Sequence, residues 1–455
     1  MSRFPGTGNR IFRLGIKPFL AVLCLLLPAF HHSAAADKTS VLSLPPLLAK
    51  PTATSITLNI VAGDAQLAWY VTYRPQGAGK DQGWLKTGEK TVAAHSASEA
   101  SLGGLRPDAR YDYRIHARQP GSRSFAVAAS GSFRTQKLLA GSFSFAVISD
   151  SHITPFHKDR LEVLSRVSTS VLKRKPDFLL MLGDNIQTFT SHGGPVTDPK
   201  FGPLLYGLLR QGLGDLTAST PIFLANGNWE GENGWHSARE REWAKAARKA
   251  YFPNPEPDTY QQGGSPDQDY YGFAWADALF LVLNVTGYTK TTHTLNSLAG
   301  ESDDWTLGEK QKEWLEVQLA RSRAKWKLLF IHHTVGGKAG DDANSRYGRG
   351  GGRAAKVGEQ AVVHGWMRRF GVQALFYGHD HVFTDMVVDG IHYTCVGSAG
   401  APWKFTTEET GYEKYWTPSG FTWVDVTQDS LRVSFLAPKA DGSEDEILHS
   451  YVISR

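Results

Sequence analysis

The sequence predicts an α/β domain preceded by a small all-β sandwich, and three observations lead to this fold class. Between residues 42 and 135, short segments of alternating apolar and polar residues are separated by turn residues, as in antiparallel sandwiches. From residue 142 onward the apolar runs are continuous and helical segments separate them, as in parallel sheets. The chain has 455 residues, of which 41% are hydrophobic and 20% charged, so we expect a globular protein of two domains or more.

The N-terminus has the pattern of a secretory signal peptide. Basic residues precede an apolar run over residues 19–30, and the small residues Ala34, Ala35 and Ala36 follow it. We expect residues 1–36 to be removed and the protein to be secreted or periplasmic. The alternative is a membrane anchor, but the run is short and contains Pro28, whereas a spanning helix needs roughly twenty apolar residues. We therefore expect no stable membrane span.

Removal of this segment would leave Cys395 as the only cysteine. The exported protein would then form no intramolecular disulfide, although its destination is oxidising. Its stability would have to come from packing. Cys395 lies in the strand-like segment 391–400, where we expect a buried, inert thiol rather than a catalytic one.

Residues 37–140 are expected to form the sandwich. Its strands are predicted over residues 55–61, 67–75, 83–92, 109–118 and 125–135. Leu105, Pro107 and Tyr111 are spaced as in the tyrosine corner of fibronectin type III domains, which this region resembles. None of its residues suggests catalysis, so we expect a structural module.

Residues 141–455 are expected to form the α/β domain. Apolar strands are predicted over residues 143–149, 177–183, 221–226, 278–285, 327–333 and 372–379. Leu161, Leu164, Val167 and Val171 share one face of a helix predicted over residues 160–175, so the strands on either side of it should be parallel. A second helix is predicted over residues 306–324, begun by Thr306 and Glu309 in a capping box. Residues 421–437 and 447–455 should be closing antiparallel strands.

Residue types that bind metals follow the apolar strands. Each of them alone has an ordinary explanation, since an Asp after a glycine can close a turn, an Asn can cap a helix and a His can lie on the surface. Their recurrence in series is the signal, because the carboxyl ends of parallel strands meet at one edge of a sheet. Imidazoles, carboxylates and a carboxamide together can hold two adjacent divalent ions. The residues are Asp150, His152, Asp184, Asn228, His332, His333, His379 and His381.

The motifs "DSH", "GDN", "GNWE", "HH" and "GHDH", in this order, resemble the calcineurin-like metallophosphoesterase superfamily over residues 142–440. With the preceding sandwich, the chain further resembles the purple acid phosphatase branch. The resemblance implies a double β-sandwich flanked by helices and two divalent or trivalent metal ions, Mn, Fe or Zn. It implies that Asp150, His152 and His381 hold one ion, that Asn228, His332 and His379 hold the other, and that Asp184 bridges them.

Three positions depart from the family pattern, and the choice between two adjacent histidines is left open. Gln187 stands where purple acid phosphatases have a tyrosinate ligand, and His152 stands where they usually have a residue that binds no metal. The site is therefore closer to the general superfamily. Trp229 stands where the family normally has a histidine that helps the leaving group depart. Of the adjacent His332 and His333, the resemblance favours His332 as the ligand and leaves His333 beside the ligands or the substrate.

The glycine-rich stretch 336–360 lies between two ligand strands, so we expect it to overhang the site as a loop. Arg346, Arg349 and Arg353 are then candidates for contacts with a phosphate group. The alternative is a solvated loop whose arginines contact only water.

The function implied is hydrolysis of a small phosphate ester by a hydroxide held between the two ions. Asp184, Asn228 and His333 are the expected catalytic residues, and Trp229, Arg346 and Arg349 the expected substrate contacts. A proton for the leaving group could come from His333 or His236, or this help could be weak. The scattered basic residues and the net charge of +5 do not specifically imply nucleic acid. The alternatives are a metal-binding scaffold without strong catalysis, or a metal-dependent hydrolase of another bond. The choice between a monoester and a diester substrate is left open, and so is the oligomeric state.

Overall fold

The computed structural model describes residues 41–79, 83–188, 198–290, 305–334, 358–402 and 412–455. The predicted signal peptide and the predicted loop arginines Arg346, Arg349 and Arg353 lie outside these residues. Residues Val41–Arg455 belong to one compact unit. None of the described helices is long and apolar enough to cross a membrane.

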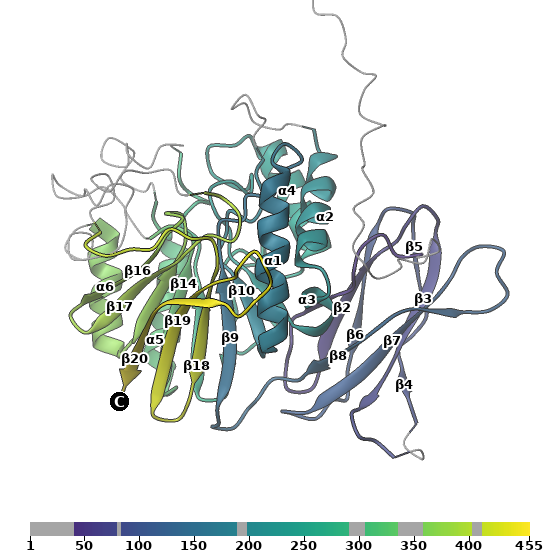
Figure 1. Cartoon of the computed structure of the whole chain (residues 1–455), viewed down its shortest axis with the longest axis horizontal. Coiled ribbons are helices and arrows are strands. Elements are labelled where there is room, and N and C mark those ends of the chain that lie inside the picture. The colour runs from purple at the N-terminus through teal and green to yellow at the C-terminus, as the bar shows by residue number, and fades with distance from the viewer. Residues whose placement is uncertain (1–40, 80–82, 189–197, 291–304, 335–357, 403–411) are drawn as a thin grey trace, which may run out of the picture. The chain divides into compact units, whose positions relative to one another are not determined.

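The N-terminal part is an all-β sandwich of two sheets (Figure 1). One sheet has the order β1 (Leu47–Ala49), β2 (Ile56–Val61), β6 (Ala97–Leu102). The other has the order β4 (Leu85–Lys86), β3 (Leu67–Pro75), β7 (Arg110–Arg118), β8 (Ala126–Arg134), and β5 (Lys90–Val92) also pairs with β3. Alternate residues of β3 and β7 are buried, so every second side chain enters the core and the others form an outer face.

Tyr111, whose spacing suggested a tyrosine corner, contacts the turn before its strand. Its hydroxyl accepts a hydrogen bond of 2.9 Å from the backbone N–H of Arg106, and its ring is buried against Phe133. This contact ties the start of β7 to the turn before it.

Two six-stranded sheets pack face to face in the C-terminal part. The first has the order β11 (Ile222–Leu224), β10 (Phe178–Met181), β9 (Phe143–Ile148), β18 (Phe421–Val426), β19 (Ser430–Ala437), β20 (Glu446–Ser454). The second has the order β12 (Tyr271–Trp275), β13 (Ala278–Val282), β14 (Trp326–Ile331), β15 (Ala374–Tyr377), β17 (Ile391–Val396), β16 (Phe383–Val388). β9, β10 and β11 are parallel, as are β13, β14 and β15, so the predicted parallel pair is confirmed.

Helices cover the outer faces of both sheets, which completes the predicted fold class (Figure 1). The first sheet packs against α1 (Lys158–Arg174), α2 (Phe201–Leu213), α3 (Leu216–Ser219) and α4 (Ala238–Tyr251). The second packs against α5 (Glu309–Arg321) and α6 (Gly358–Phe370). Strand alternation divides the cores: Phe143, Phe145 and Val147 of β9 face the other sheet, whereas Ala146 and Ile148 face the helices.

The capping box predicted at Thr306 and Glu309 is wrong. Helix α5 begins at Glu309, and its N-cap is Gly308, which has φ 72° and no side-chain capping bond. The backbone N–H of Leu307 donates instead to Glu359 of α6 at 2.7 Å. Leu307 precedes the N-cap, so this bond ties the segment before α5 to α6 and does not cap α5.

Cys395 is fully buried in β17, as expected. Burial raises the pKa of its thiol well above the usual value, so the reactive thiolate is disfavoured.

Candidate metal centre

The predicted metal ligands follow the carboxyl ends of parallel strands from both sheets. Asp150 and His152 come after β9, Asp184 after β10 and Asn228 after β11, all in the first sheet. His332 comes after β14, and His379 and His381 after β15, in the second sheet. The seven side chains, called the proposed ligands below, meet where the ends of the two sheets face each other.

Asp150, His152 and His381 form one group that could hold a metal ion. The Nε2 atoms of His152 and His381 are 3.2 Å apart. Oδ1 of Asp150 lies 3.8 Å from His152 Nε2 and 3.4 Å from His381 Nε2. All three side chains are buried, so their donor atoms converge on a small space away from bulk water.

Asp184, His332 and His379 form the second group. His332 Nε2 lies 3.2 Å from Asp184 Oδ2 and 3.3 Å from His379 Nδ1. The carboxamide oxygen of Asn228 joins them, 3.1 Å from His332 Nε2 and 2.9 Å from His379 Nδ1. Asp184 Oδ2 is also 3.3 Å from His152 Nε2 of the first group, so one carboxylate oxygen lies beside both groups.

The donor set fits a pair of metal ions. His332 Nδ1 lies 2.8 Å from the carbonyl oxygen of Leu182, and His381 Nδ1 lies 2.9 Å from that of Pro402. A carbonyl oxygen only accepts, so each Nδ1 carries a proton and donates it. In the neutral ring, Nε2 then keeps its lone pair directed into the site. Imidazole nitrogens together with carboxylate and carboxamide oxygens suit first-row divalent cations.

The backbone at the site is held in an uncommon conformation. Positive φ angles occur at Asp150 (55°), His152 (46°), Asp184 (49°), His379 (73°) and His381 (58°). For residues other than glycine this region is sparsely populated and persists where the surroundings enforce it, often at functional sites. The strain turns successive side chains toward one point.

Two glycines explain why β10 and β11 end where they do. A Cβ at Gly183 would lie 2.6 Å from the backbone N of Gly227, and one at Gly227 would lie 2.3 Å from the backbone N of Asp184. No other residue fits this contact between the two loops. It places Asp184 and Asn228 side by side.

Charges at the site favour ionised carboxylates. Burial by itself would raise the pKa of Asp184, but the charges of His332 and His152 and their hydrogen bonds hold it below its usual value. Burial lowers the pKa of His332, and the neighbouring Asp184 outweighs this and raises it to about 10. Without metal ions, the proton on His332 therefore helps to balance the carboxylates, and bound cations would take that role.

Glu230, the last residue of "GNWE", holds the ligand loops together and was given no role from the sequence. It is fully buried, and its carboxylate accepts hydrogen bonds from the backbone N–H groups of Asp184 (3.0 Å), Asn185 (2.7 Å) and Gly227 (2.7 Å). Burial and then the charge of Asp184 raise its pKa to about 8. The only signal in the sequence was an acidic residue two positions after the proposed ligand Asn228.

Asp380, between the ligands His379 and His381, was also missed. Its carboxylate is buried and accepts a hydrogen bond from the hydroxyl of Tyr412, which lies 2.8 Å from the hydroxyl of Tyr377. Tyr377 ends β15, so this chain of hydroxyl groups anchors the ligand loop to its strand.

The adjacent His332 and His333 differ in their surroundings. His332 contacts Asp184 and Asn228, as given above. The His333 ring centroid lies 4.6 Å from that of His379 and 4.3 Å from that of Trp305, and its Nδ1 donates to the carbonyl of Thr334 at 2.7 Å. His333 therefore lies beside the second group of ligands without belonging to it.

Trp229 and Gln187 occupy two of the positions that depart from the family pattern. The ring centroid of Trp229 lies 5.3 Å from that of His152, edge to face. The carboxamide oxygen of Gln187 accepts a hydrogen bond from Arg160 at 2.5 Å, and Gln187 belongs to neither ligand group. His236 lies 3.7 Å from Glu240 and packs on Trp235.

The ligands differ in exposure. Asp150, His152, Asp184 and His332 are buried, whereas Asn228, Trp229 and His379 are partly exposed. A substrate would therefore approach over Asn228, His379 and the indole of Trp229.

Comparison with known proteins agrees with this fold. At the level of fold, the chain is similar to a solved structure of PhoD, with 15% identity, a TM-score of 0.69 and coverage of 92% of each chain. It is also similar to the purple acid phosphatase PPD1 from yellow lupin (Lupinus luteus) seeds, with 14% identity, a TM-score of 0.65 and coverage of 90% of this chain and 74% of the other. The comparison with curated proteins returned no match.

The family model for calcineurin-like phosphoesterases matches residues 143–383. This range contains β9 to β15 and all seven proposed ligands. Because the match spans more than half of the 455 residues, the chain belongs to the calcineurin-like phosphoesterase family.

Proposed function

We propose that this protein is an exported phosphoesterase that uses two metal ions to hydrolyse phosphate monoesters or diesters. Asp150, His152 and His381 would hold one ion, Asn228, His332 and His379 the other, and Asp184 would bridge them. The observation that carries this proposal is the position of Asp184 Oδ2, which lies 3.3 Å from His152 and 3.2 Å from His332. One oxygen can thus contact an ion in each group.

Metal ions at these positions would supply Lewis acidity, which lowers the pKa of water and offsets charge on the phosphate oxygens. The chain's own residues orient the reaction. Asn228 and His379 are partly exposed, so their side chains border the space that a phosphate group would enter. The backbone N–H of Trp229 donates to Asp184 Oδ1 at 2.8 Å, which keeps Oδ2 turned toward the histidines.

If a histidine supplies the proton to the leaving group, as the alternative to weak acid help, His333 is better placed than His236. Its ring contacts His379, whereas the described contacts of His236 are with Glu240 and Trp235. Its Nδ1 donates to a backbone carbonyl, so Nε2 is the nitrogen that would exchange a proton with substrate. Trp229 offers an aromatic surface beside His152 and has no group that transfers a proton at neutral pH.

Several further features belong to the same proposal. Residues 1–36 would be a signal peptide for secretion or export to the periplasm, residues 37–140 a fibronectin type III-like module and residues 141–455 the catalytic domain. The tyrosine-corner contact of Tyr111 with Arg106 supports the module. Mn, Fe and Zn all suit the nitrogen and oxygen donors. With Gln187 in place of a tyrosinate, the iron form would lack a purple charge-transfer band.

The test is metal analysis combined with two assays. We expect about two metal ions per chain in protein purified without chelators, as in other dinuclear hydrolases. The same protein should release p-nitrophenol from p-nitrophenyl phosphate or from bis-p-nitrophenyl phosphate, and the ratio of the two rates would distinguish a phosphatase from a phosphodiesterase. A metal content near zero without hydrolysis would overturn the proposal in favour of a scaffold protein. Bound metal without hydrolysis of either ester would reject the proposed reaction and leave the proposed metal site standing.

A further inference from the structure

Arg160, in the first turn of α1, connects the loops that follow β9 and β10. Its Nη1 donates to the backbone carbonyl of His152 at 3.1 Å and to the carboxamide oxygen of Gln187 at 2.5 Å. The same loops pair through their backbones, since the N–H of His152 donates to the carbonyl of Asp184 at 2.8 Å. Arg160 therefore lies next to a proposed metal ligand, although its contact is with the backbone of His152 rather than with the imidazole.

These contacts use only one of the three guanidinium nitrogens of Arg160. Among the described residues, none accepts a hydrogen bond from its Nε or Nη2, and no carboxylate forms an ion pair with it. Neither nitrogen is one of the buried polar atoms that lack a partner, and the side chain is partly exposed. Both nitrogens are therefore accessible from solvent.

Two other arginines show what this pair of nitrogens binds. Nε and Nη2 lie on one edge of the guanidinium group, and in Arg248 this edge donates to both carboxylate oxygens of Glu232, at 2.6 and 3.0 Å. In Arg174 the same edge donates to Asp445, at 3.0 and 2.9 Å. Such parallel N–H donors match the oxygens of a carboxylate or a phosphate. Arg160 has the same edge, and no described carboxylate occupies it.

A missing carboxylate does not by itself indicate a ligand site, as Arg210 shows. In the described part of the chain Arg210 also has no carboxylate partner, but it is fully buried. Its three nitrogens all donate to oxygens of Asn59 and Pro45, so its hydrogen-bonding capacity is used within the fold. Arg160 differs because an open edge remains after its structural contacts are made.

Arg160 is also short of a compensating negative charge. Burial lowers the pKa of its guanidinium group, and the charge of the adjacent Asp159 opposes this. Asp159 is exposed, and within the described residues it forms no ion pair with Arg160. A partly buried cation without a paired anion is unfavourable, so a bound anion would stabilise it.

Arg160 and Trp229 flank the proposed ligand His152. The ring of Trp229 packs on the imidazole of His152 at 5.3 Å. Its carbonyl accepts a hydrogen bond of 2.8 Å from the hydroxyl of Thr188, the residue after Gln187. Arg160 and Trp229 are both partly exposed, whereas Gln187 and Thr188 are buried. A substrate that passes over Trp229 would therefore also come near Arg160.

Arg160 would meet a part of the substrate other than the phosphate at the metal centre. Among the described carboxylates, only that of Asp159 acts on the pKa of Arg160, so its guanidinium group is not an immediate neighbour of Asp184, the proposed bridge. The phosphate under attack would lie beside that bridge, whereas the guanidinium group lies beyond the backbone of His152. A group carried by the leaving group can reach this position.

We propose that Arg160 binds a second phosphate group, carried by the leaving group of the substrate, while the first phosphate lies at the metal centre. This inference rests on the proposed function and narrows its substrate class to small organic bisphosphates. A phosphate is favoured over a carboxylate because its charge of about −1.5 to −2 at pH 7 attracts the guanidinium group more strongly against the opposing charge of Asp159. The bonds from Nη1 hold the guanidinium plane in place before substrate binds, which reduces the cost of ordering it.

Binding of phosphonates by the whole, metal-loaded protein tests this proposal without turnover. Isothermal titration calorimetry compares a series from propane-1,3-bisphosphonate to hexane-1,6-bisphosphonate with alkylphosphonates of the same chain lengths. Wild type should bind the best-fitting bisphosphonate about tenfold more tightly than its alkylphosphonate, as expected for hydrogen bonds between charged groups. Arg160→Gln should remove this preference and leave the affinity for the alkylphosphonate and the metal content close to wild type.

Two further variants separate the open edge from charge alone. Arg166→Gln is the matched control, because Arg166 is another partly exposed arginine of α1, and it should keep the preference. Arg160→Lys keeps the charge without the paired donors and should lose most of the preference.

Four results would overturn the proposal. Equal affinities for the two kinds of phosphonate in wild type would do so and leave the proposed function standing. Equal loss of both affinities, or loss of metal, in Arg160→Gln would mean that Arg160 only positions the loop of His152. Tighter binding of 6-phosphonohexanoate than of any bisphosphonate would assign the edge to a carboxylate. Absence of both metal and phosphonate binding in wild type would reject the proposed function as well.

Discussion

Asp184 and Trp229 are joined by a hydrogen bond of 2.8 Å, from the backbone N–H of Trp229 to Oδ1 of the aspartate. This bond occupies one carboxylate oxygen and leaves Oδ2 to face His152 at 3.3 Å and His332 at 3.2 Å. The carboxylate is thus oriented by one loop and shared by two groups of ligands. The first prediction rests on this arrangement.

Replacing Asp184 by Asn should remove both metal ions and abolish activity. An amide has no negative charge to offset two cations, and when its oxygen accepts the bond from Trp229 its NH₂ group, which cannot bind a metal, faces the histidines. We expect a loss greater than the roughly tenfold to hundredfold that removal of an outer hydrogen-bond partner costs. Metal content and turnover of the purified variant are the measurements. Wild-type values for both would exclude Asp184 as the bridge.

Glu230→Gln should weaken metal binding while the protein stays folded. Both carboxylate oxygens of Glu230 accept hydrogen bonds from backbone N–H groups. The amide of the variant keeps only one acceptor oxygen, so the bonds to the other are lost. An outer partner of this kind contributes about tenfold to hundredfold in metal affinity or activity.

Glu232→Gln is the matched control for this variant. Glu232 is buried two residues further on and pairs with Arg248 at 2.6 Å, away from the proposed ligands. It should lower thermal stability and leave metal affinity close to wild type. Equal metal affinities in the two variants would show that Glu230 only packs.

The metal-free protein should lose stability as pH rises from 7 to 9. The folded-state pKa of His332 is raised to about 10, so its proton stabilises the fold below the unfolded value of about 6.5 and this contribution is lost as pH approaches 10. The pKa of Glu230 is raised to about 8, so the folded protein keeps a proton that the unfolded chain has already released. Stability therefore also falls at this residue as pH rises. Urea unfolding of chelated protein at pH 7 and 9 measures this, and a rise in stability would contradict it. Metal-loaded protein should show a smaller decrease, because cations replace these protons.

The sandwich and the α/β part should unfold together, with Arg210 as a main contact. Arg210 of α2 is fully buried. It donates to Oδ1 of Asn59 at 2.6 Å, to the carbonyl of Asn59 at 2.7 Å and to that of Pro45 at 2.8 Å. Arg210→Ala leaves these acceptors unpaired beside a cavity, so we expect a loss of about 2–5 kcal/mol in the free energy of unfolding.

Denaturant unfolding followed by two probes measures this effect. Wild type should show one coincident transition, and Arg210→Ala the same transition at lower denaturant. Arg323→Ala, which removes an exposed arginine, should leave the midpoint unchanged. Two separate transitions in wild type would show that the sandwich is an independent module.

The strands and the ligand positions could be predicted because both depend on local patterns. A buried parallel strand is an apolar run, and the residue that ends it has to face the edge of the sheet, so Asp150, Asp184 and His332 were identified from their places in the chain. Contacts between segments that are distant in sequence could not be predicted in this way. The capping box at Thr306 failed because the N-cap is Gly308, which has no side chain to cap the helix. Strand β6 was missed because its sequence, ASEASL, consists mostly of small and polar residues and lacks an apolar alternation. Its pairing with β2 defines it as a strand.

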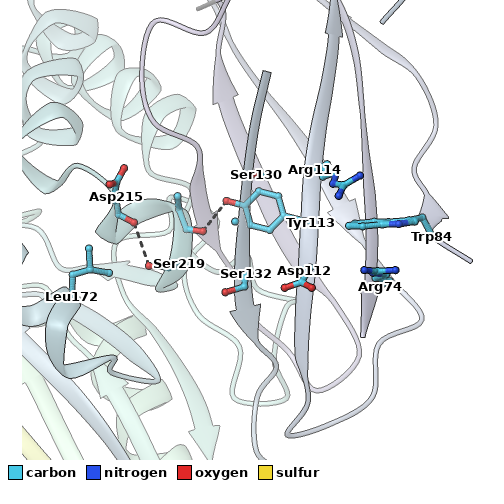
Figure 2. Close-up of a pocket in the computed structure, with 12 residues that line it drawn as sticks. Arg74, Trp84, Asp112, Tyr113, Arg114, Ser130, Ser132, Leu172, Asp215 and Ser219 are labelled. Carbon is cyan, nitrogen blue, oxygen red and sulfur yellow. Dashed lines mark hydrogen bonds between the residues drawn. The ribbon is translucent and has the colours of Figure 1, made fainter. Parts of the chain in front are cut away.

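The same limit applies to the groups around the ligands. Glu230 binds backbone N–H groups of two loops, and Asp380 is held by Tyr412 from a segment 32 residues away. Neither contact leaves a periodic signal. Likewise, Arg74 and Arg114 lie over opposite faces of Trp84 only once β3, β4 and β7 pair (Figure 2).

Trp229 leads to the last prediction, which concerns the leaving group. Its indole packs edge to face on His152 at 5.3 Å and cannot transfer a proton at neutral pH. General acid catalysis contributes about a hundredfold to ten-thousandfold. Its absence slows the departure of alkoxides far more than that of activated phenolates, which leave without a proton. We therefore expect the wild-type rate to depend steeply on the pKa of the leaving group.

Trp229→His should flatten this dependence by accelerating alkyl esters most, and Trp229→Phe is the matched control because it keeps an aromatic ring against His152 without a titratable group. Rates across a series of phosphate esters with graded leaving-group pKa give the slope for each variant. If His333 already supplies the proton, the wild-type slope is shallow and neither variant changes it. If Trp229 replaces an acid, only the histidine variant becomes shallower, while an equal change in both variants would mean that the bulk of the indole, rather than its lack of a proton, governs the reaction.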